Sequence, residues 1–180
     1  MRLRDLDGLG FPKVLDALAA LTVSHPGAEV CLALMPAPTR PAAEHALDRQ
    51  WSFFRLLEVS GSLPLTAFPD IREALALASH AGAMLPGERL VEVRTVLQQV
   101  QLLSQFLAAR VATTPVLADL PRRLHPLPEL EAALARMLDD AGVVRDDASP
   151  RLAELRAALR DLRQNIEDRL GRLVQTGGES

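Results

Sequence analysis

The feature that most constrains this chain is a row of leucines near its end. In the stretch 149–174, leucine or isoleucine recurs in alternating steps of three and four residues, at Leu152, Leu155, Leu159, Leu162, Ile166, Leu170 and Leu173. At 100° per residue these side chains fall within a wedge of roughly 80°, narrower than the core-facing side of a globular helix. We call these residues the seam. Because Ser149 suits an N-cap and Pro150 a first helical position, the stretch predicts a single helix of about 37 Å.

The residues that follow the seam offer it no partner. Only Gln-Thr-Gly-Gly-Glu-Ser remains, and we predict a disordered tail over 175–180. The seam could fold back on the preceding helices, pair with another chain, or belong to a longer protein whose next helix would cover it. The narrow stripe favours the last two. We therefore expect an interface seam and a homodimer.

The composition predicts an all-α protein. Of the 180 residues 48% are hydrophobic, with no tyrosine and one tryptophan, so residues that favour strands are scarce. Prolines mark the helix starts, and we expect helices beginning near 11, 26, 39, 70, 85, 114 and 127. They end near 23, 35, 58, 78, 109, 120 and 138, and 139–149 forms a non-helical loop. The predicted architecture is an irregular multi-helix core domain over 1–148, followed by a long protruding lever or coiled-coil helix over 149–174.

Apolar periodicity assigns inward faces to the two longest core helices. In the helix 39–58 the rhythm is kept by Ala43, Ala46, Leu47, Trp51, Phe54 and Leu57. In the helix 85–109 it is kept by Leu90, Val93, Leu97, Val100, Leu103 and Leu107. The lone Cys31 excludes an intramolecular disulfide, and its apolar surroundings predict a buried helical thiol.

The charge of the chain argues against strong autonomous nucleic-acid binding. The net charge is −3, and Lys13 is the single lysine. No surface is forced to be strongly basic, as tight sequence-independent binding would require. The sequence contains neither an apolar amino-terminal signal run nor eighteen consecutive apolar residues, which predicts a cytoplasmic protein with no membrane partner.

Residues that carry chemistry are scattered. No Gly-rich loop precedes a lysine, so a P-loop is absent from the sequence. The histidines at 25, 45, 80 and 125 have no second strong metal ligand in register. The pairs Asp139–Asp140 and Asp146–Asp147 could hold Mg²⁺, but their places at helix ends favour a structural role. We assign no catalytic, cofactor-binding or metal-binding residue and expect no cofactor.

Three arginines beside the seam are candidate contact residues. Arg156, Arg160 and Arg163 cluster within roughly 60° on the helical wheel. They could contact phosphates of nucleic acid, or pair with acidic residues as charges beside coiled-coil seams do. Glu167 follows Arg163 by four residues, a spacing that favours pairing.

Four segments in order carry a family resemblance. They are Gly10-Phe-Pro-Lys-Val-Leu with Ser24-x-x-Gly27, then Leu65-x-x-Phe-Pro-Asp-Ile-Arg-x-Ala-Leu75, then Leu85-Pro-Gly-Glu-x-Leu90, and last Gly142-Val-Val-Arg-Asp-Asp-Ala-Ser-Pro-x-Leu152. Over residues 1–174 the chain resembles the amino-terminal region of a bacterial MutS paralogue family. Members of this MutS2-type family lack the mismatch-recognition domain and carry a carboxy-terminal Smr nuclease.

The resemblance implies a helical core followed by the ascending helix of a lever arm. In that family the arm leads to a nucleic-acid clamp and returns, and an ABC-type ATPase and the Smr nuclease follow. The family is implicated in suppressing homologous recombination and in rescuing collided ribosomes, with branched DNA or ribosomal RNA as partners. ATP and Mg²⁺ are implied for the full-length protein only. We therefore expect this chain to be a non-catalytic part of a longer protein, coupling ATPase to clamp and supporting dimerisation.

Two alternatives stay open. The chain could be a stand-alone helical adaptor or oligomerisation module. A reading frame that continues into Gly-x-x-x-x-Gly-Lys-Ser/Thr would exclude that alternative. It could also be a helical enzyme of the chorismate-mutase type, since Arg156 and Arg160 lie on a leucine-rich helix. That activity would need convergent arginine and lysine, and Lys13 stands beside a proline at a helix start.

Overall fold

The computed structural model describes residues 8–111 and 113–177, with side chains through Leu170. Within these residues the fold is all-α, as predicted, and the closest approach to a strand pair is an isolated antiparallel bridge between Leu138 and Val144. The elements are α2 (Phe11–Ala20), α3 (His25–Leu32), α4 (Arg40–Ser60), α5 (Arg72–Ala78), α6 (Gly87–Ala108), the 3₁₀ turn η1 (Pro115–Leu117), α7 (Asp119–Arg123), α8 (Pro128–Met137) and α9 (Pro150–Gly177).

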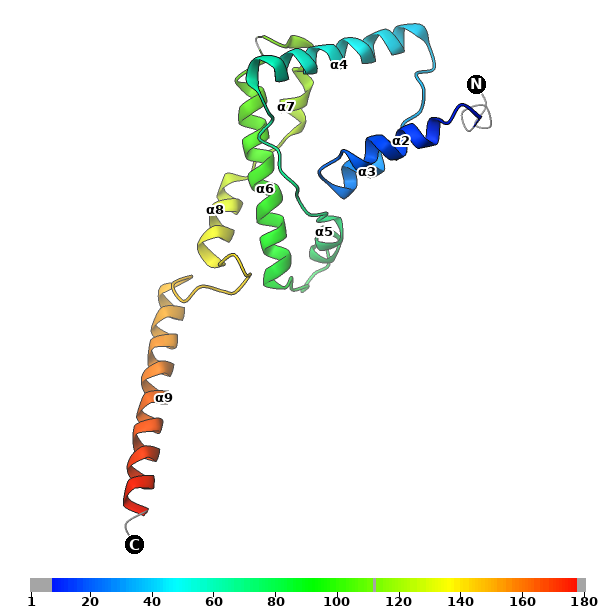
Figure 1. The fold of residues 1–180 in the computed structure, drawn as a ribbon. Helices are drawn as coiled ribbons and strands as arrows, with labels where there is room; N and C mark the ends of the chain where they lie inside the picture. Colours follow the sequence, from blue (N-terminus) through cyan, green and yellow to red (C-terminus); the bar gives the residue numbers. More distant parts are fainter. Residues whose placement is uncertain (1–7, 112, 178–180) are drawn as a thin grey trace.

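The helix α6 organises the core domain. Figure 1 shows it as a long rod crossed at its carboxyl end by α4, with α7 and α8 along its side. The buried leucines Leu56, Leu107 and Leu117 meet where α4, α6 and η1 come together. Phe53 and Phe106 are among the partly buried side chains that pack around them. This apolar cluster holds the carboxyl end of α6.

Local capping sets several helix starts where the sequence predicted them. The Ser24 hydroxyl accepts the Gly27 N–H at 3.2 Å, and the Thr39 hydroxyl accepts the Ala42 N–H at 3.4 Å. Proline follows each cap within the first turn, where a missing N–H leaves no hydrogen bond unmade. The helices α2 and α3 pack against each other as a hairpin (Figure 1).

Three predictions about the core domain need correction. The face of α4 assigned inward is exposed at Leu47, Trp51 and Phe54, because the helix directs Phe53 and Leu56 toward the core cluster instead. Cys31 is half-buried rather than buried, since the α2–α3 hairpin has few neighbours. The single helix expected over 114–120 is instead η1 followed by α7, which continues to Arg123.

The last helix, α9, extends away from the core domain (Figure 1). Its start is capped as predicted, since the Ser149 hydroxyl accepts the Leu152 N–H at 3.2 Å. The helix continues to Gly177, so residues 175–177 of the expected tail are helical, and 178–180 lie outside the described residues. The sequence therefore predicted a long carboxy-terminal helix and placed its end three residues too early.

Candidate functional site

The seam on α9 is open to solvent. Leu155, Leu159, Leu162, Ile166 and Leu170 are 50–61% exposed, whereas Leu152 near the root of the helix is half-buried. The side chain of Leu173 lies outside the described residues. No helix of the described core domain packs along α9 (Figure 1). A row of half-exposed leucines over several turns is an unusual apolar surface for a soluble helix, and such surfaces mark interaction sites.

Two of the three candidate arginines converge on one carboxylate. Arg156 donates from Nη1 to Asp146 Oδ1 and also to the Val144 carbonyl at 2.9 Å. Arg160 donates from Nη1 to Asp146 Oδ2 at 2.9 Å. Asp146 lies in the loop before α9, so both contacts tie the first turns of the helix to that loop. All three side chains keep contact with solvent, with Asp146 and Arg160 each 61% exposed.

The electrostatics of this group favour its ionised form. The Arg156 hydrogen bond, more than any other contact, lowers the pKa of the Asp146 carboxyl below its ordinary value, and Arg160 lowers it further. Among residues with described side chains, Arg163 has no ion pair, so the expected pairing with Glu167 does not form. The structure thus separates the arginines into two that are held by the loop and one that is not.

The remaining aspartates of the two pairs, for which the sequence favoured a structural role, serve the loop itself. Asp139 accepts the backbone N–H groups of Ala141 and Val143 at 3.0 and 2.8 Å. Asp140 accepts Arg94 at 2.7 Å, and Asp147 accepts Arg145 at 3.2 Å. Each carboxylate has a protein donor, as expected of side chains that shape a turn.

A glycine contact joins this loop to the amino end of α6. A Cβ built on Gly87 would lie 1.8 Å from the Gly142 carbonyl oxygen, and one on Gly142 would lie 2.5 Å from the carbonyl carbon of Gly87. Gly142 also has φ +79°, a conformation that other residues adopt at a cost. Two segments of the family resemblance, 85–90 and 142–152, therefore meet backbone to backbone.

Arg94 fastens the same loop from α6. Its guanidinium donates to Asp140 at 2.7 Å and to the Leu138 carbonyl at 3.4 Å, and only 11% of its side chain is exposed. The Arg145 N–H donates to the Met137 carbonyl at 2.9 Å and completes the bridge at Leu138. We call the loop 138–149 with Gly87 and Arg94 the joint, because it connects α6 and α8 to α9.

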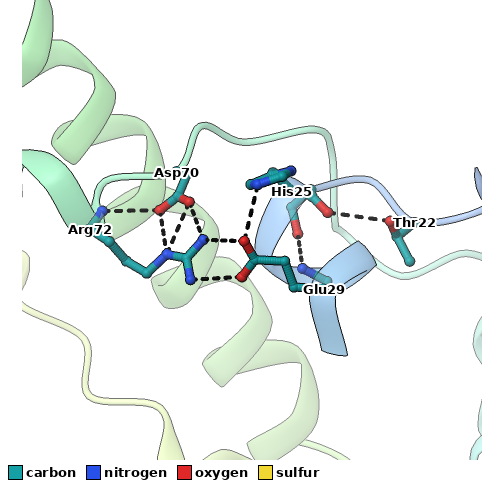
Figure 2. Close-up of polar contacts among 7 residues, drawn as sticks. Thr22, His25, Glu29, Asp70 and Arg72 are labelled. Atoms are coloured by element: carbon teal, nitrogen blue, oxygen red, sulfur yellow. Dashed lines mark hydrogen bonds and ion pairs between the residues drawn. The ribbon is translucent and has the colours of Figure 1, made fainter. Parts of the chain in front are cut away.

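A second polar cluster fixes the α2–α3 hairpin. Figure 2 shows the Arg72 guanidinium between two carboxylates, with Nη1 2.7 Å from Glu29 Oε2 and Nε 2.9 Å from Asp70 Oδ1. The side chain and backbone N–H of Arg72 lower the pKa of Asp70 to about 2, and the Arg72 side chain also lowers the pKa of Glu29. His25 Nε2 lies 3.1 Å from Glu29 Oε1. This cluster connects the first two segments of the resemblance, and its geometry is that of a structural clasp.

The sequence offers the seam and the arginines as candidates, but it does not show that Asp146 is the partner of Arg156 and Arg160. Asp146 was considered as a metal ligand, and the available signal was its position ten and fourteen residues before Arg156 and Arg160. The approach of Gly87 to Gly142 had no local signal beyond a glycine in each segment. Within the described residues, no helix combines the length and apolar content needed to cross a bilayer.

Comparison with known proteins covers nearly the whole chain, although no family model matches it. The chain is 35% identical over 178 residues to endonuclease MutS2 of Thermus thermophilus, a match that covers 97% of this chain. It is 33% identical over 172 residues to endonuclease MutS2 of Symbiobacterium thermophilum and 34% identical over 168 residues to that of Solidesulfovibrio magneticus, covering 96% and 92% of this chain. These matches cover only 21–22% of the relatives, so the chain spans about a fifth of their length.

Proposed function

Since this chain belongs to the MutS2 family, we propose that it supplies the helical core and the first lever helix of a nucleic-acid-processing ATPase and endonuclease. In this proposal the chain has no turnover of its own and needs no cofactor. It passes the state of an ATPase to a nucleic-acid clamp, while ATP and Mg²⁺ are bound elsewhere in the full-length protein.

The wider role follows the same family. We propose that the full-length protein acts in the cytoplasm on branched DNA or on ribosomal RNA, in suppressing homologous recombination and in rescuing collided ribosomes. The relatives are named as endonucleases, which supports nucleic acid as the substrate class. Purified as it stands, the chain should hydrolyse neither ATP nor DNA, and turnover of either by this chain would contradict a non-catalytic role.

The observation that carries the lever proposal is that α9 is exposed along most of its length while the loop at its amino end is held by the joint. The seam is exposed over most of its length, while Gly87 and Arg94 hold the loop that precedes it. A helix transmits movement only if its attachment is stiffer than its surroundings. The joint provides that attachment through backbone contact and several donors to one loop.

The exposed seam also supports self-association. Burying a half-exposed leucine contributes about 1 kcal/mol, and the seam offers at least five such residues. Arginines flank the seam on both sides, with Arg156, Arg160 and Arg163 on one flank and Arg151 and Arg169 on the other. Arg151 is already paired with Glu154, and Arg156 and Arg160 are paired with Asp146, so these charges leave the seam open to a second copy.

Sedimentation velocity at increasing protein concentration tests this. We expect dimers that become more populated as the protein concentration rises, and we expect Leu159→Gln to shift the protein to monomer. Leu75→Gln is the matched control, because Leu75 is 55% exposed and Leu159 is 50% exposed. A strict monomer at high concentration would rule out self-association through the seam and leave the lever role to be tested in the full-length protein.

A further inference from the structure

The arrangement around Asp146 differs from an ordinary surface ion pair because one carboxylate serves two arginines of the same helix face. Each oxygen of Asp146 accepts one guanidinium, from Arg156 and from Arg160. Arg163 continues the row and has no ion pair among the described side chains. An oxygen of a phosphodiester presents the same chemistry to these donors as a carboxylate oxygen does.

We propose that Arg156, Arg160 and Arg163 form a phosphodiester-binding strip and that Asp146 occupies its first two members until a nucleic-acid backbone displaces it. Asp146 is then an autoinhibitory contact built into the joint. The proposal rests on the proposed function only in taking nucleic acid as the partner. It adds the residues that contact the backbone and the group that competes with it.

The spacing of the row fits a polyanion. Residues 156 and 163 are seven positions apart on α9, which places their Cα atoms about 10.5 Å apart along the helix axis. One DNA strand advances about 3.4 Å per nucleotide, so the row spans about three nucleotide steps. Glu167 lies on the same side one turn beyond Arg163 and limits the strip at that end.

The contact with Asp146 is weak enough to exchange. The three side chains are 35–61% exposed, and solvent screening makes ion pairs in such surroundings weak. Phosphate contacts gain in addition from release of counterions, a gain that grows as salt falls. At low salt the nucleic acid should displace Asp146, and at high salt Asp146 should retain the arginines.

The experiment is fluorescence anisotropy of a labelled 20-nucleotide single-stranded DNA, titrated with the whole chain at 50 and 200 mM salt. Asp146→Asn should raise the affinity about tenfold at 200 mM salt, where Asp146 retains both arginines in the wild type, and by less at 50 mM, where the nucleic acid displaces Asp146. Asp161→Asn is the matched control, because it removes the same charge from an exposed aspartate of α9 and should change the affinity less than twofold. Equal gains in both variants, or no gain in Asp146→Asn, would overturn the proposal.

Two further variants separate competition from damage to the joint. Asp146→Glu keeps a carboxylate in the loop and should stay at wild-type affinity, whereas a gain there would show that distortion of the loop is responsible and overturn the proposal. Adding Arg160→Ala to Asp146→Asn should remove most of the gain in DNA affinity. A gain retained in the double variant would show that the DNA contacts other residues and would overturn the proposal. Sedimentation velocity of the same variants measures dimerisation through the seam independently of DNA binding. If the arginines do not bind DNA, dimerisation can still be observed, and if the chain does not dimerise, the DNA affinities can still be compared.

Discussion

The two ends of α6 are held by different forces. At its carboxyl end, Leu107 packs with Leu56 and Leu117 in an apolar cluster that is nearly closed to solvent. At its amino end, Leu134 and Leu138 are buried along α8, but the loop to α9 is held by a glycine contact and by arginines. Hydrophobic burial is non-directional, whereas backbone fit and hydrogen bonds depend on geometry. The core cluster therefore stabilises the fold, and the joint fixes the direction in which α9 leaves the core domain.

The largest expected effect tests the stability half of this comparison. Leu107→Ala should lower the free energy of unfolding by about 2–5 kcal/mol, because it removes buried apolar contacts and leaves a cavity. Leu159→Ala makes the same chemical change in the exposed seam and should alter the unfolding of the monomer by less than about 0.5 kcal/mol. Urea denaturation at low protein concentration measures both. Similar losses in the two variants would show that α9 is part of the core.

An intermediate effect tests the joint. Gly142→Ala should destabilise the protein by more than the 1–2 kcal/mol or so that a left-handed backbone costs alanine, since the new Cβ also meets Gly87. Gly82→Ala is the matched control, because Gly82 has the same φ of +79° and nothing within 4 Å of its Cβ. Hydrogen exchange should show faster exchange over 139–148 in the Gly142 variant only. Equal destabilisation and equal hydrogen exchange in the two variants would show that the contact between Gly87 and Gly142 does not stabilise the joint.

The smallest expected effect concerns the clasp at Arg72, which belongs to neither end of α6. The pKa of Asp70 is about 2 in the folded protein and near 3.9 in an unfolded chain, so ionised Asp70 favours the folded state above about pH 4. That contribution is lost as the pH falls toward 2. Thermal unfolding from pH 5 to 2 should therefore depend less on pH in Asp70→Asn than in the wild type. Asp48→Asn, an exposed aspartate on α4, should retain the full dependence.

The sequence predicted what neighbouring residues decide. The cap at Ser149 formed as expected, because it needs only a side-chain oxygen and an N–H three residues later. The helix starts expected near 26 and 39 formed as well, with Ser24 and Thr39 as their caps. The all-α class followed from composition, and the narrow width of the seam suited its exposure to solvent.

What the sequence could not predict depends on distant segments. Periodicity showed that Leu47, Trp51 and Phe54 share a face of α4 but not that Phe53 and Leu56, on another face, meet the core cluster. Arg72 and Glu29 are 43 residues apart, and nothing local pairs them. In the sequence, Asp146 could equally be a metal ligand or a charge at a helix end. Only the structure shows that the first turns of α9 lie against the loop and bring Arg156 to Asp146.

The approach of Gly87 to Gly142 has a mechanical consequence. Gly87 is the first residue of α6, and Gly142 lies eight positions before the first residue of α9. Because neither residue has a side chain, two planar peptide groups are in direct contact. No change of rotamer can therefore accommodate a sideways displacement at this contact. A sideways force on the carboxyl end of α9, roughly 40 Å away, would therefore act as a torque on the contact between Gly87 and Gly142. That torque would rotate α6 instead of being absorbed by side-chain movement.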